Sequence, residues 1–253
     1  MSPVDKKLGE HLSSEPRLAR PLDAEQYQLN VRMPASASLA DFNHTAQSGV
    51  ISFVEQLING QLDQLVCFGA DQTGKSHLCY AAVRAAKHSG LSACVLQLQA
   101  DDPSNLLADI SMFDFIALDD IDQILQTPAE SLLFDFINRA KSLKQKLLLS
   151  SQDAEFNCHI QDLRSRLMQG ARFELPVMST WEERMDFIEQ TAKLRHLKFS
   201  NRLCRLIAQE GPITSGGMTR MILEVELILA GKPFKKLSAD QIKQIELVIA
   251  QSH

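Results

Sequence analysis

The segment Gly69–Ser76 constrains the fold of this chain more than any other feature of its sequence. It reads Gly-Ala-Asp-Gln-Thr-Gly-Lys-Ser and fills every fixed position of the pattern G-x-x-x-x-G-K-[ST]. The apolar run QLVCFGA leads into it and LCYAAVRAAKHSG follows, which predicts a strand before the loop and a helix after it. The two glycines allow the backbone to curl so that successive N–H groups point into one concavity. The sequence therefore predicts a phosphate-binding loop.

Each part of this loop has an expected contact with a bound diphosphate. Lys75 would reach the β- and γ-phosphates, the Ser76 hydroxyl would bind Mg²⁺, and the positive end of the following helix would add to the attraction. A chance loop with a surface lysine is the alternative, and the strand-loop-helix context argues against it. The nucleotide-binding residues predicted here are Gly69, Gln72, Thr73, Gly74, Lys75, Ser76 and His77.

The run FIALDD at residues 115–120 is the expected companion of the loop. An apolar strand that ends in acidic residues places carboxylates at the carboxyl edge of a parallel sheet, beside the phosphate loop. Asp119 would hold Mg²⁺, and Asp120 would orient and deprotonate an attacking water. The alternative is a pair of aspartates that caps the next turn. Asp122 is expected at the surface. A guanine-nucleotide switch would need an N-K-x-D element, which the sequence lacks, so ADP or ATP is the expected ligand.

Strands and helices alternate along the middle of the chain. Further strands are predicted for SACVLQLQ, KLLLSSQ and RFELPVM, and a helix for ESLLFDFINRAKSLK. This alternation predicts an α/β fold with a five-stranded parallel sheet covered on both faces. The expected domains are a mobile tail over 1–32, a nucleotide-binding α/β core over 33–178, and a small all-helical domain over 179–253.

The helical domain is predicted from its caps and its apolar periodicity. Ser179 and Glu182 offer a capping box for a helix that runs to about Leu197. Helices are then expected for NRLCRLIAQE, which Gly211 ends, for MTRMILEVELILA, which Gly231 ends, and for ADQIKQIELVIAQ.

Composition narrows the class of protein further. The 253 residues contain 45% hydrophobic and 23% charged residues, as in ordinary globular proteins, with no apolar run of the length that a membrane helix needs. The polar, proline-broken N-terminus is not a secretory signal, so we expect a cytoplasmic protein without a membrane partner. Five scattered cysteines without C-x-x-C spacing argue against a zinc site or a disulfide framework. A net charge of −5 favours a protein partner over sequence-specific binding to DNA.

These motifs together resemble the DnaA/Hda branch of AAA+ ATPases. The resemblance runs from about Gln26 to the C-terminal helices, through MPASASLADF, GKSHLCYAA, FIALDDID, LLLSSQD and DLRSRL. It implies a P-loop AAA+ core followed by a helical lid, with the nucleotide between them and with Leu39 and Phe42 near the adenine. The resemblance also leaves open whether the chain forms a homo-oligomer.

The resemblance also assigns roles to polar residues that are unremarkable by themselves. Arg166 matches the family's arginine finger, which acts in trans, and Arg164 is the second candidate; solvated arginines are the simpler interpretation of the same residues. Ser151 and Gln152 lie where the family has its sensor-1 group, and the glutamine there leaves open whether this chain hydrolyses ATP itself. The sensor-2 position falls on Arg220 or on Thr219.

Two further features separate the regulators of this branch from its initiators. The chain ends soon after the expected lid, without a helix-turn-helix domain, and QYQLNV at residues 26–31 resembles the peptide by which such factors grip the DNA polymerase sliding clamp. In that peptide Gln26, Tyr27, Leu29 and Val31 are the expected contact residues, with a plain linker as the alternative.

The resemblance therefore implies a regulator of replication initiation. It would bind the sliding clamp and the DnaA initiator, and Arg166 would stimulate hydrolysis of the initiator's ATP. A P-loop adaptor or loader that recruits another replication protein is the alternative, and a stand-alone metabolic kinase is a third possibility.

Overall fold

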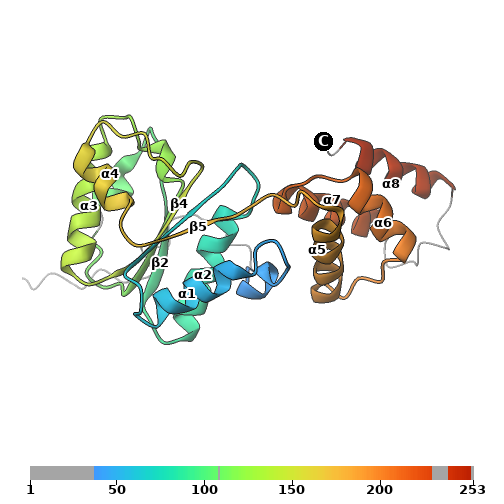
Figure 1. Ribbon diagram of the computed structural model, residues 1–253, viewed down its shortest axis with the longest axis horizontal. Coiled ribbons are helices and arrows are strands. Elements are labelled where there is room, and N and C mark those ends of the chain that lie inside the picture. The colour runs from blue at the N-terminus through green and yellow to red at the C-terminus, as the bar shows by residue number, and fades with distance from the viewer. Residues whose placement is uncertain (1–36, 108, 230–238, 252–253) are drawn as a thin grey trace, which may run out of the picture. The chain divides into compact units, whose positions relative to one another are not determined.

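The computed structural model describes residues 37–107, 109–229 and 239–251. Within them, five strands form one parallel sheet in the order β2-β3-β4-β1-β5 (Figure 1). The strands are β1 (Gln64–Phe68), β2 (Ala93–Gln97), β3 (Phe115–Asp119), β4 (Lys146–Ser151) and β5 (Ala171–Glu174). The predicted α/β fold with a five-stranded parallel sheet is thus confirmed.

The central strands are apolar on both faces because helices cover the sheet on both sides. Every residue of β3 is buried, and so are the middle residues of β1 and β4. α1 (Gly49–Ile58) and α2 (Lys75–His88) lie on one face, and α3 (Glu130–Ser142) and α4 (Gln161–Leu167) lie on the other (Figure 1). Short 3-10 turns complete this part: η2 (Leu39–Phe42), η3 (Pro103–Leu107) and η4 (Ile121–Gln123).

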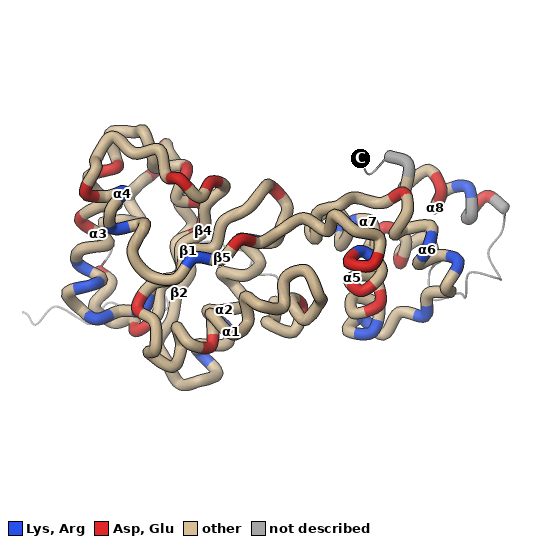
Figure 2. Tube along the Cα trace, viewed as in Figure 1, with Lys and Arg blue, Asp and Glu red and all other residues tan. Residues whose placement is uncertain are grey.

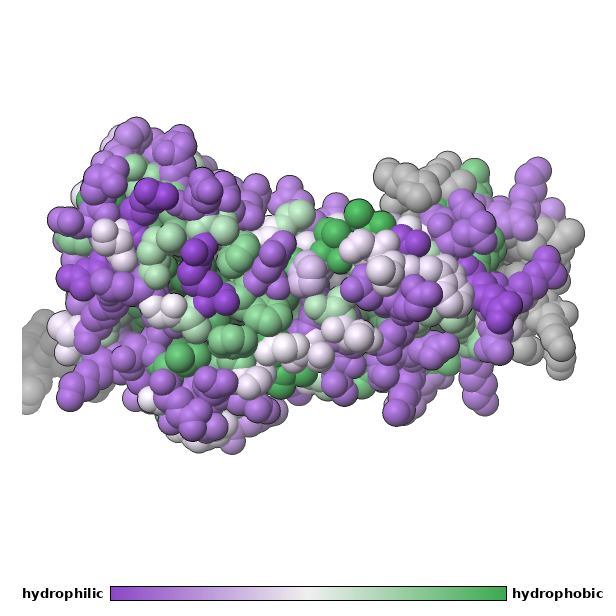
Figure 3. Space-filling view, in the orientation of Figure 1, coloured by the Kyte–Doolittle hydropathy of each residue, from purple (hydrophilic) through white to green (hydrophobic). Residues whose placement is uncertain are grey.

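The register of the sheet brings the ends of its strands to one edge. Phe68 of β1 pairs with Ser151 of β4, and Asp119 of β3 pairs with Gln97 of β2. The loop after β1 therefore meets the last residues of β3 and β4 at the carboxyl edge of the sheet. At the outer edge, hydrophobic residues reach the surface over β5 and α1 (Figure 3). The rings of Phe53 on α1 and Phe173 on β5 pack 5.6 Å apart.

The C-terminal part contains four described helices, α5 (Trp181–Leu194), α6 (Asn201–Glu210), α7 (Ser215–Leu229) and α8 (Ala239–Gln251). They enclose an apolar cluster of their own, which includes Met178, Ile207, Ile222 and Ile245 and is distinct from the cluster under α3 and α4. None of the helices in the described residues is long and apolar enough to cross a membrane.

Two local predictions in this part were wrong. The box at the start of α5 is formed by Thr180 and Glu183, one residue later than expected, because Thr180 takes the extended N-cap conformation and its hydroxyl accepts from the Glu183 N–H. α7 begins at Ser215 rather than at Met218, so both glycines of the Ser-Gly-Gly sequence belong to the helix.

Candidate functional site

The predicted phosphate loop lies between β1 and α2, and its two glycines are required by its shape. Gly69 has φ of 154°, and a Cβ there would lie 2.5 Å from the carbonyl oxygen of Leu175. Gly74, the N-cap of α2, has φ of 97°, in the left-handed region that favours glycine. Gln72 also has a positive φ, of 62°. These conformations turn the chain tightly over the start of α2.

Backbone donors of this loop are left unpaired. Among the described residues, no hydrogen-bond partner is found for the N–H groups of Gln72, Gly74, Lys75 and Ser76. Thr73 is buried, and its hydroxyl donates to the Ala70 carbonyl at 2.9 Å, which closes the loop from inside. Unpaired N–H groups at the N-terminus of a helix form a site for an anion.

Lys75 places a cation over the same loop. Its ammonium donates to the carbonyl oxygens of Gly69 at 2.7 Å and Ala70 at 2.9 Å. The side chain thus lies across the loop rather than extending into solvent. A phosphate that replaced these two carbonyls would gain a full ionic partner.

Asp119 ends β3 as a buried carboxylate, 1% exposed, that is only half satisfied. Its Oδ1 accepts from the Ser150 hydroxyl at 2.7 Å, and the Cys79 thiol lies 3.9 Å away, whereas Oδ2 has no partner among the described residues. Cys79 follows Ser76 by three residues on α2, so the Ser76 hydroxyl lies on the same side of the helix. A free carboxylate oxygen and a free hydroxyl are ligands that Mg²⁺ uses, so these residues fit the ion.

Asp120 follows in a left-handed conformation, with φ of 62°. Its N–H donates to the Ser150 hydroxyl at 2.8 Å, so this one hydroxyl joins both aspartates to β4. Its Oδ1 is buried without a partner in the described part of the chain. Burial raises the pKa of Asp120, and the neighbouring Asp122 and Asp119 raise it further, against the effects of Gln123 and Lys75. A carboxylate with a raised pKa is suited to accept a proton.

Two residues at this edge have contacts that the sequence did not predict, Ser150 and Asp122. Asp122 is partly buried instead of lying free at the surface, and its carboxylate accepts from the Ser151 hydroxyl at 2.8 Å and the Gln152 N–H at 2.6 Å. The Gln152 side chain in turn donates to Asp71 of the phosphate loop at 3.0 Å. The two residues expected as sensor-1 thus connect the end of β4 to η4 through Asp122 and to the phosphate loop through Asp71.

A cavity of about 320 Å³ adjoins Gly74 and is lined by η2, the start of α2, α5 and α7. Phe42 and His77 line it with their rings 5.6 Å apart, and His77 Nε2 lies 2.7 Å from the Asp41 carboxylate. Leu39 is not among its lining residues. On α7, Thr219 lines the cavity, whereas Arg220 is exposed and does not. Of the two sensor-2 candidates, Thr219 is therefore the one beside the cavity.

The first turn of α7 contacts the phosphate loop directly. The Gly216 N–H donates to the Gln72 carbonyl at 2.7 Å. A Cβ at Gly216 would lie 2.8 Å from that oxygen, so only glycine allows this approach. The helical part of the chain thus touches the loop that is predicted to bind phosphate.

The two arginines of α4 have different surroundings. Arg164 Nε donates to the Glu155 carbonyl at 3.0 Å. No hydrogen bond or ion pair of the Arg166 guanidinium occurs within the described residues, and this side chain is partly exposed. Burial lowers the pKa of Lys141 on α3, and the nearby charge of Arg166 lowers it further. Basic positions on α3 and α4 are visible in Figure 2.

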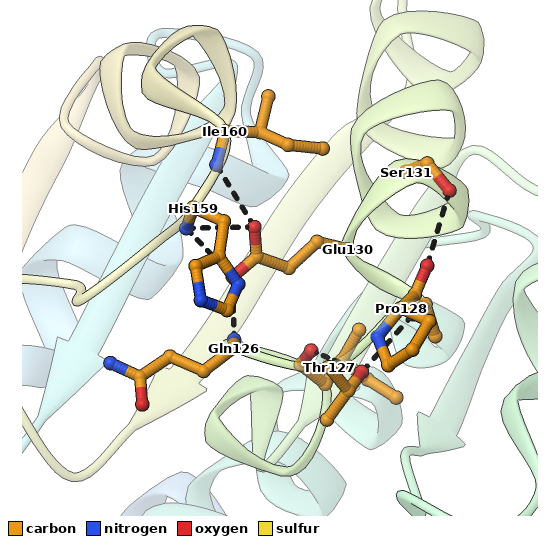
Figure 4. Close-up of polar contacts among 9 residues, drawn as sticks. Gln126, Thr127, Pro128, Glu130, Ser131, His159 and Ile160 are labelled. Atoms are coloured by element: carbon orange, nitrogen blue, oxygen red, sulfur yellow. Dashed lines mark hydrogen bonds and ion pairs between the residues drawn. The ribbon is translucent and has the colours of Figure 1, made fainter.

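The segment before α4 is fixed by Glu130, the first residue of α3. This carboxylate is 2% exposed and accepts from the N–H groups of Gln126, His159 (2.9 Å) and Ile160 (3.0 Å) (Figure 4). Burial opposes the ionisation of Glu130, but these hydrogen bonds outweigh it and lower the pKa of the side chain. The sequence offered no motif for this role.

The predicted clamp peptide, residues 26–31, lies outside the described residues.

Sheet order, phosphate loop and helical C-terminal part define a P-loop α/β protein of the AAA+ fold. The chain is similar to the solved structure of AMPPCP-bound DnaA from Aquifex aeolicus, with 20% sequence identity and a TM-score of 0.67 over 85% of this chain and 71% of that one. It is also similar to domain III of Thermotoga maritima DnaA, with 14% identity and a TM-score of 0.69 over 87% of this chain and 100% of that one. A third similar structure is the Thermotoga maritima RuvB Holliday junction branch-migration motor, with 18% identity and a TM-score of 0.61 over 84% of this chain and 72% of that one. No protein-family profile and no curated protein matches the sequence. At these identities the similarity shows the fold.

Proposed function

We propose that the chain binds an adenine nucleotide and acts as an Hda-like regulator of the replication initiator. The observation that carries nucleotide binding is the row of unpaired N–H groups under the Lys75 ammonium, beside a half-satisfied Asp119. Ser76 and Asp119 would hold Mg²⁺, which would neutralise phosphate charge. The similar DnaA structure that contains AMPPCP supports an adenine nucleotide as the ligand.

In this proposal Arg166 acts on the ATP of a neighbouring initiator. An arginine finger needs a guanidinium that is not already paired within its own chain, because it must reach a γ-phosphate across an interface. Arg166 meets this condition better than Arg164, whose Nε already donates to Glu155. The positive charge of Lys141 nearby favours an anionic target as well.

The nucleotide bound by this chain would mainly hold the core and the helical lid in the binding-competent arrangement. The hydrogen bond from Gly216 to Gln72 supports this role, because a phosphate that orders the loop would also fix the first turn of α7. Gln152 at the expected sensor-1 position, engaged with Asp71, supports weak hydrolysis by the chain itself. Residues 26–31 would dock on the sliding clamp and bring Arg166 to the initiator.

The test measures hydrolysis of initiator-bound ATP in the presence of DNA-loaded clamp and this protein. Arg166→Ala should reduce the stimulated rate by roughly 1,000-fold or more, since a finger stabilises charge that develops in the transition state. Arg164→Ala on the same helix is the matched control and should retain most of the stimulation. Deletion of residues 26–31 should abolish the dependence on clamp. If Arg166→Ala stimulates as well as the unaltered protein, the finger assignment is wrong.

A further inference from the structure

The C-terminal helices contain a strongly basic segment that the proposed mechanism does not use. Residues 193–205, KLRHLKFSNRLCR, include five Lys and Arg residues and no Asp or Glu, in a chain whose net charge is −5. They occupy the last turn of α5, the connecting loop and the first half of α6. Basic positions gather there, whereas acidic positions lie on the earlier turns of α5 (Figure 2). Charge of one sign gathered in this way attracts a partner of the opposite sign.

Four of the five cations are not neutralised by the chain itself. Arg195 is engaged, because its guanidinium lies 3.1 Å from the Glu226 carboxylate. The other four side chains are exposed, and none of them has an ion pair or a hydrogen bond among the described residues. These four residues are called the basic patch: Lys193, Lys198, Arg202 and Arg205. Their ammonium and guanidinium groups remain available to an external anion.

The basic patch does not stabilise the helix on which half of it lies. Arg202 and Arg205 are three residues apart, so they lie on the same side of α6, where like charges repel. The first turn of α6 has no acidic residue, and a cation there opposes the helix dipole. The other side of α6, with Leu203 and Ile207, packs into the apolar cluster of the helical part. The arrangement costs stability, as is common for residues kept for binding.

The surroundings of the basic patch favour a nucleic acid over a protein or a membrane. Protein interfaces depend on apolar and aromatic anchors, and within residues 193–205 Leu194 is the only large hydrophobic residue that is exposed. A membrane-bound helix inserts its apolar face, whereas the apolar face of α6 is already buried. Interfaces with DNA are much more positively charged, and most of their hydrogen bonds go to the phosphate backbone. Asn201, exposed beside Arg202, adds a neutral donor of the kind that phosphates accept from.

A duplex fits better than a single strand. Single-stranded nucleic acid is held largely by stacking of its bases on exposed aromatic rings. The one Phe, Tyr or Trp residue in this segment is Phe199, which packs against the apolar cluster instead. The cations of the patch can therefore contact a backbone, without a platform for unpaired bases.

We propose that the basic patch binds the phosphate backbone of duplex DNA without reading its sequence. Lys193, Lys198, Arg202 and Arg205 each contact a phosphate. This contact goes beyond the proposed function and does not depend on it, but its use does rest on it. A regulator that acts at a DNA-loaded clamp would hold its helical part against the DNA that the clamp encircles, and a second attachment of this kind raises the overall affinity.

The experiment measures binding of the full chain to a fluorescent DNA duplex by anisotropy, without clamp or initiator. We expect a dissociation constant of about 1–100 μM near physiological salt, and equal affinity for two duplexes of unrelated sequence. Between about 50 and 200 mM salt, the logarithm of the affinity should fall against the logarithm of the salt concentration with a slope of roughly −3 to −4, because four phosphates are contacted.

Two double variants with the same net charge test where the DNA binds. Arg202→Gln with Arg205→Gln should weaken binding by roughly tenfold and reduce the magnitude of the salt slope by about 2. Lys87→Gln with Lys144→Gln, at exposed positions of the α/β part, is the matched control and should leave both values unchanged. Circular dichroism checks that both variants are folded.

Three results would overturn the inference. The first is no binding of the duplex by the unaltered protein even at low salt. The second is an equal loss in both double variants, which would show that net charge rather than the basic patch governs binding. The third is binding to phosphatidylserine vesicles but not to the duplex, which would assign the patch to a membrane surface. Failure of the Arg166 test would leave the duplex measurement unaffected, because that measurement contains neither clamp nor initiator.

Discussion

Two groups of carboxylates in the α/β part, each with buried oxygens, lie in opposite electrostatic situations. Glu130, at the start of α3, receives three backbone N–H groups and has a lowered pKa. Asp119 and Asp120, at the end of β3, each keep a buried oxygen without a partner in the described residues, and the pKa of Asp120 is raised by burial. The two groups therefore differ in the supply of donors.

The difference follows from what surrounds each carboxylate. The turn before α3 and the segment before α4 direct their N–H groups inward, and Glu130 joins them (Figure 4). The Ser150 hydroxyl donates to Asp119 and accepts from the Asp120 N–H. It therefore provides a hydrogen-bond donor to only one of the two aspartate side chains. The unpaired N–H groups of the phosphate loop lie at the same edge of the sheet.

The chain thus has one carboxylate that stabilises the fold and two that are suited to binding. A carboxylate that receives backbone N–H groups of other residues in the chain stabilises the fold, whereas a half-satisfied one beside unpaired N–H groups lowers stability until a ligand provides partners. The first kind should be sensitive to substitution in unfolding experiments. The second kind should be sensitive in binding experiments.

Among the variants that test this contrast, the largest effect is expected from Lys75→Ala, at the edge of the sheet where the phosphate-loop N–H groups are unpaired. Removing the ammonium should weaken nucleotide binding by about 100-fold or more, on the order of 3 kcal/mol, because a charge-assisted contact to phosphate is lost. Calorimetry with ADP and ATP measures the effect. Lys87→Ala, at the exposed end of the same helix, is the control and should bind normally. If both variants bind alike, the unpaired donors at this edge do not form the nucleotide site.

Glu130→Ala tests the satisfied carboxylate. It leaves three inward-facing N–H groups without an acceptor, and we expect it to lower the free energy of unfolding by about 3 kcal/mol. Urea denaturation followed by circular dichroism measures the change. Glu155→Ala, whose side chain is exposed, should be close to neutral. Equal stability of the two variants would show that the three N–H groups do not depend on Glu130.

The pH dependence of stability sharpens the same contrast. The folded pKa of Glu130 lies below its ordinary value of 4.5, so the contribution of its carboxylate is fully present above that value. It is lost as the pH falls through the folded pKa. The difference in unfolding free energy between the unaltered protein and Glu130→Gln should therefore be constant near neutral pH and narrow below pH 4.5. If the difference in unfolding free energy instead grows as the pH falls, the protonated form of Glu130 is the one that stabilises the fold.

The sequence specified the fold largely because its strongest signals are local. Strand, glycine loop and helix follow one another around Gly69–Ser76, and apolar runs alternate with helical periodicity up to Pro176. The box at Thr180 was misplaced by one residue because adjacent serine and threonine both cap helices well. The division of residues 33–178 and 179–253 into separate domains stays a prediction.

Details of the site were harder to predict from the sequence. They depend on which face of a strand or helix a side chain occupies, and on contacts between residues far apart in the chain. Ser150 and Ser151 are neighbours on β4, and only the strand register decides which hydroxyl reaches Asp119. Likewise, the start of α7 at Ser215 decides that Thr219 lines the cavity. Gln47 meets Pro176 across 129 positions of the chain, and no sequence pattern signals such a contact.

Asp120→Asn has the smallest expected effect and the opposite sign from Glu130→Ala. In the absence of nucleotide it should raise the free energy of unfolding by a few tenths of a kcal/mol, since partial exposure of the side chain limits the cost of its charge. Asparagine also tolerates the left-handed backbone found here. Because the folded pKa is raised, the gain should be present at neutral pH and vanish below the ordinary value of 3.8.

Asp122→Asn, two residues further on, is the matched variant for this last prediction. Its carboxylate accepts from Ser151 and Gln152, so replacing one oxygen by an NH₂ group should lower stability where Asp120→Asn raises it. Thermal unfolding of both variants at pH 7 and pH 3.5 measures the two signs. If Asp120→Asn destabilises the protein as Asp122→Asn does, then the Asp120 carboxylate already has its hydrogen-bond donors. Asp119 would then be the one carboxylate at the end of β3 that lacks a donor.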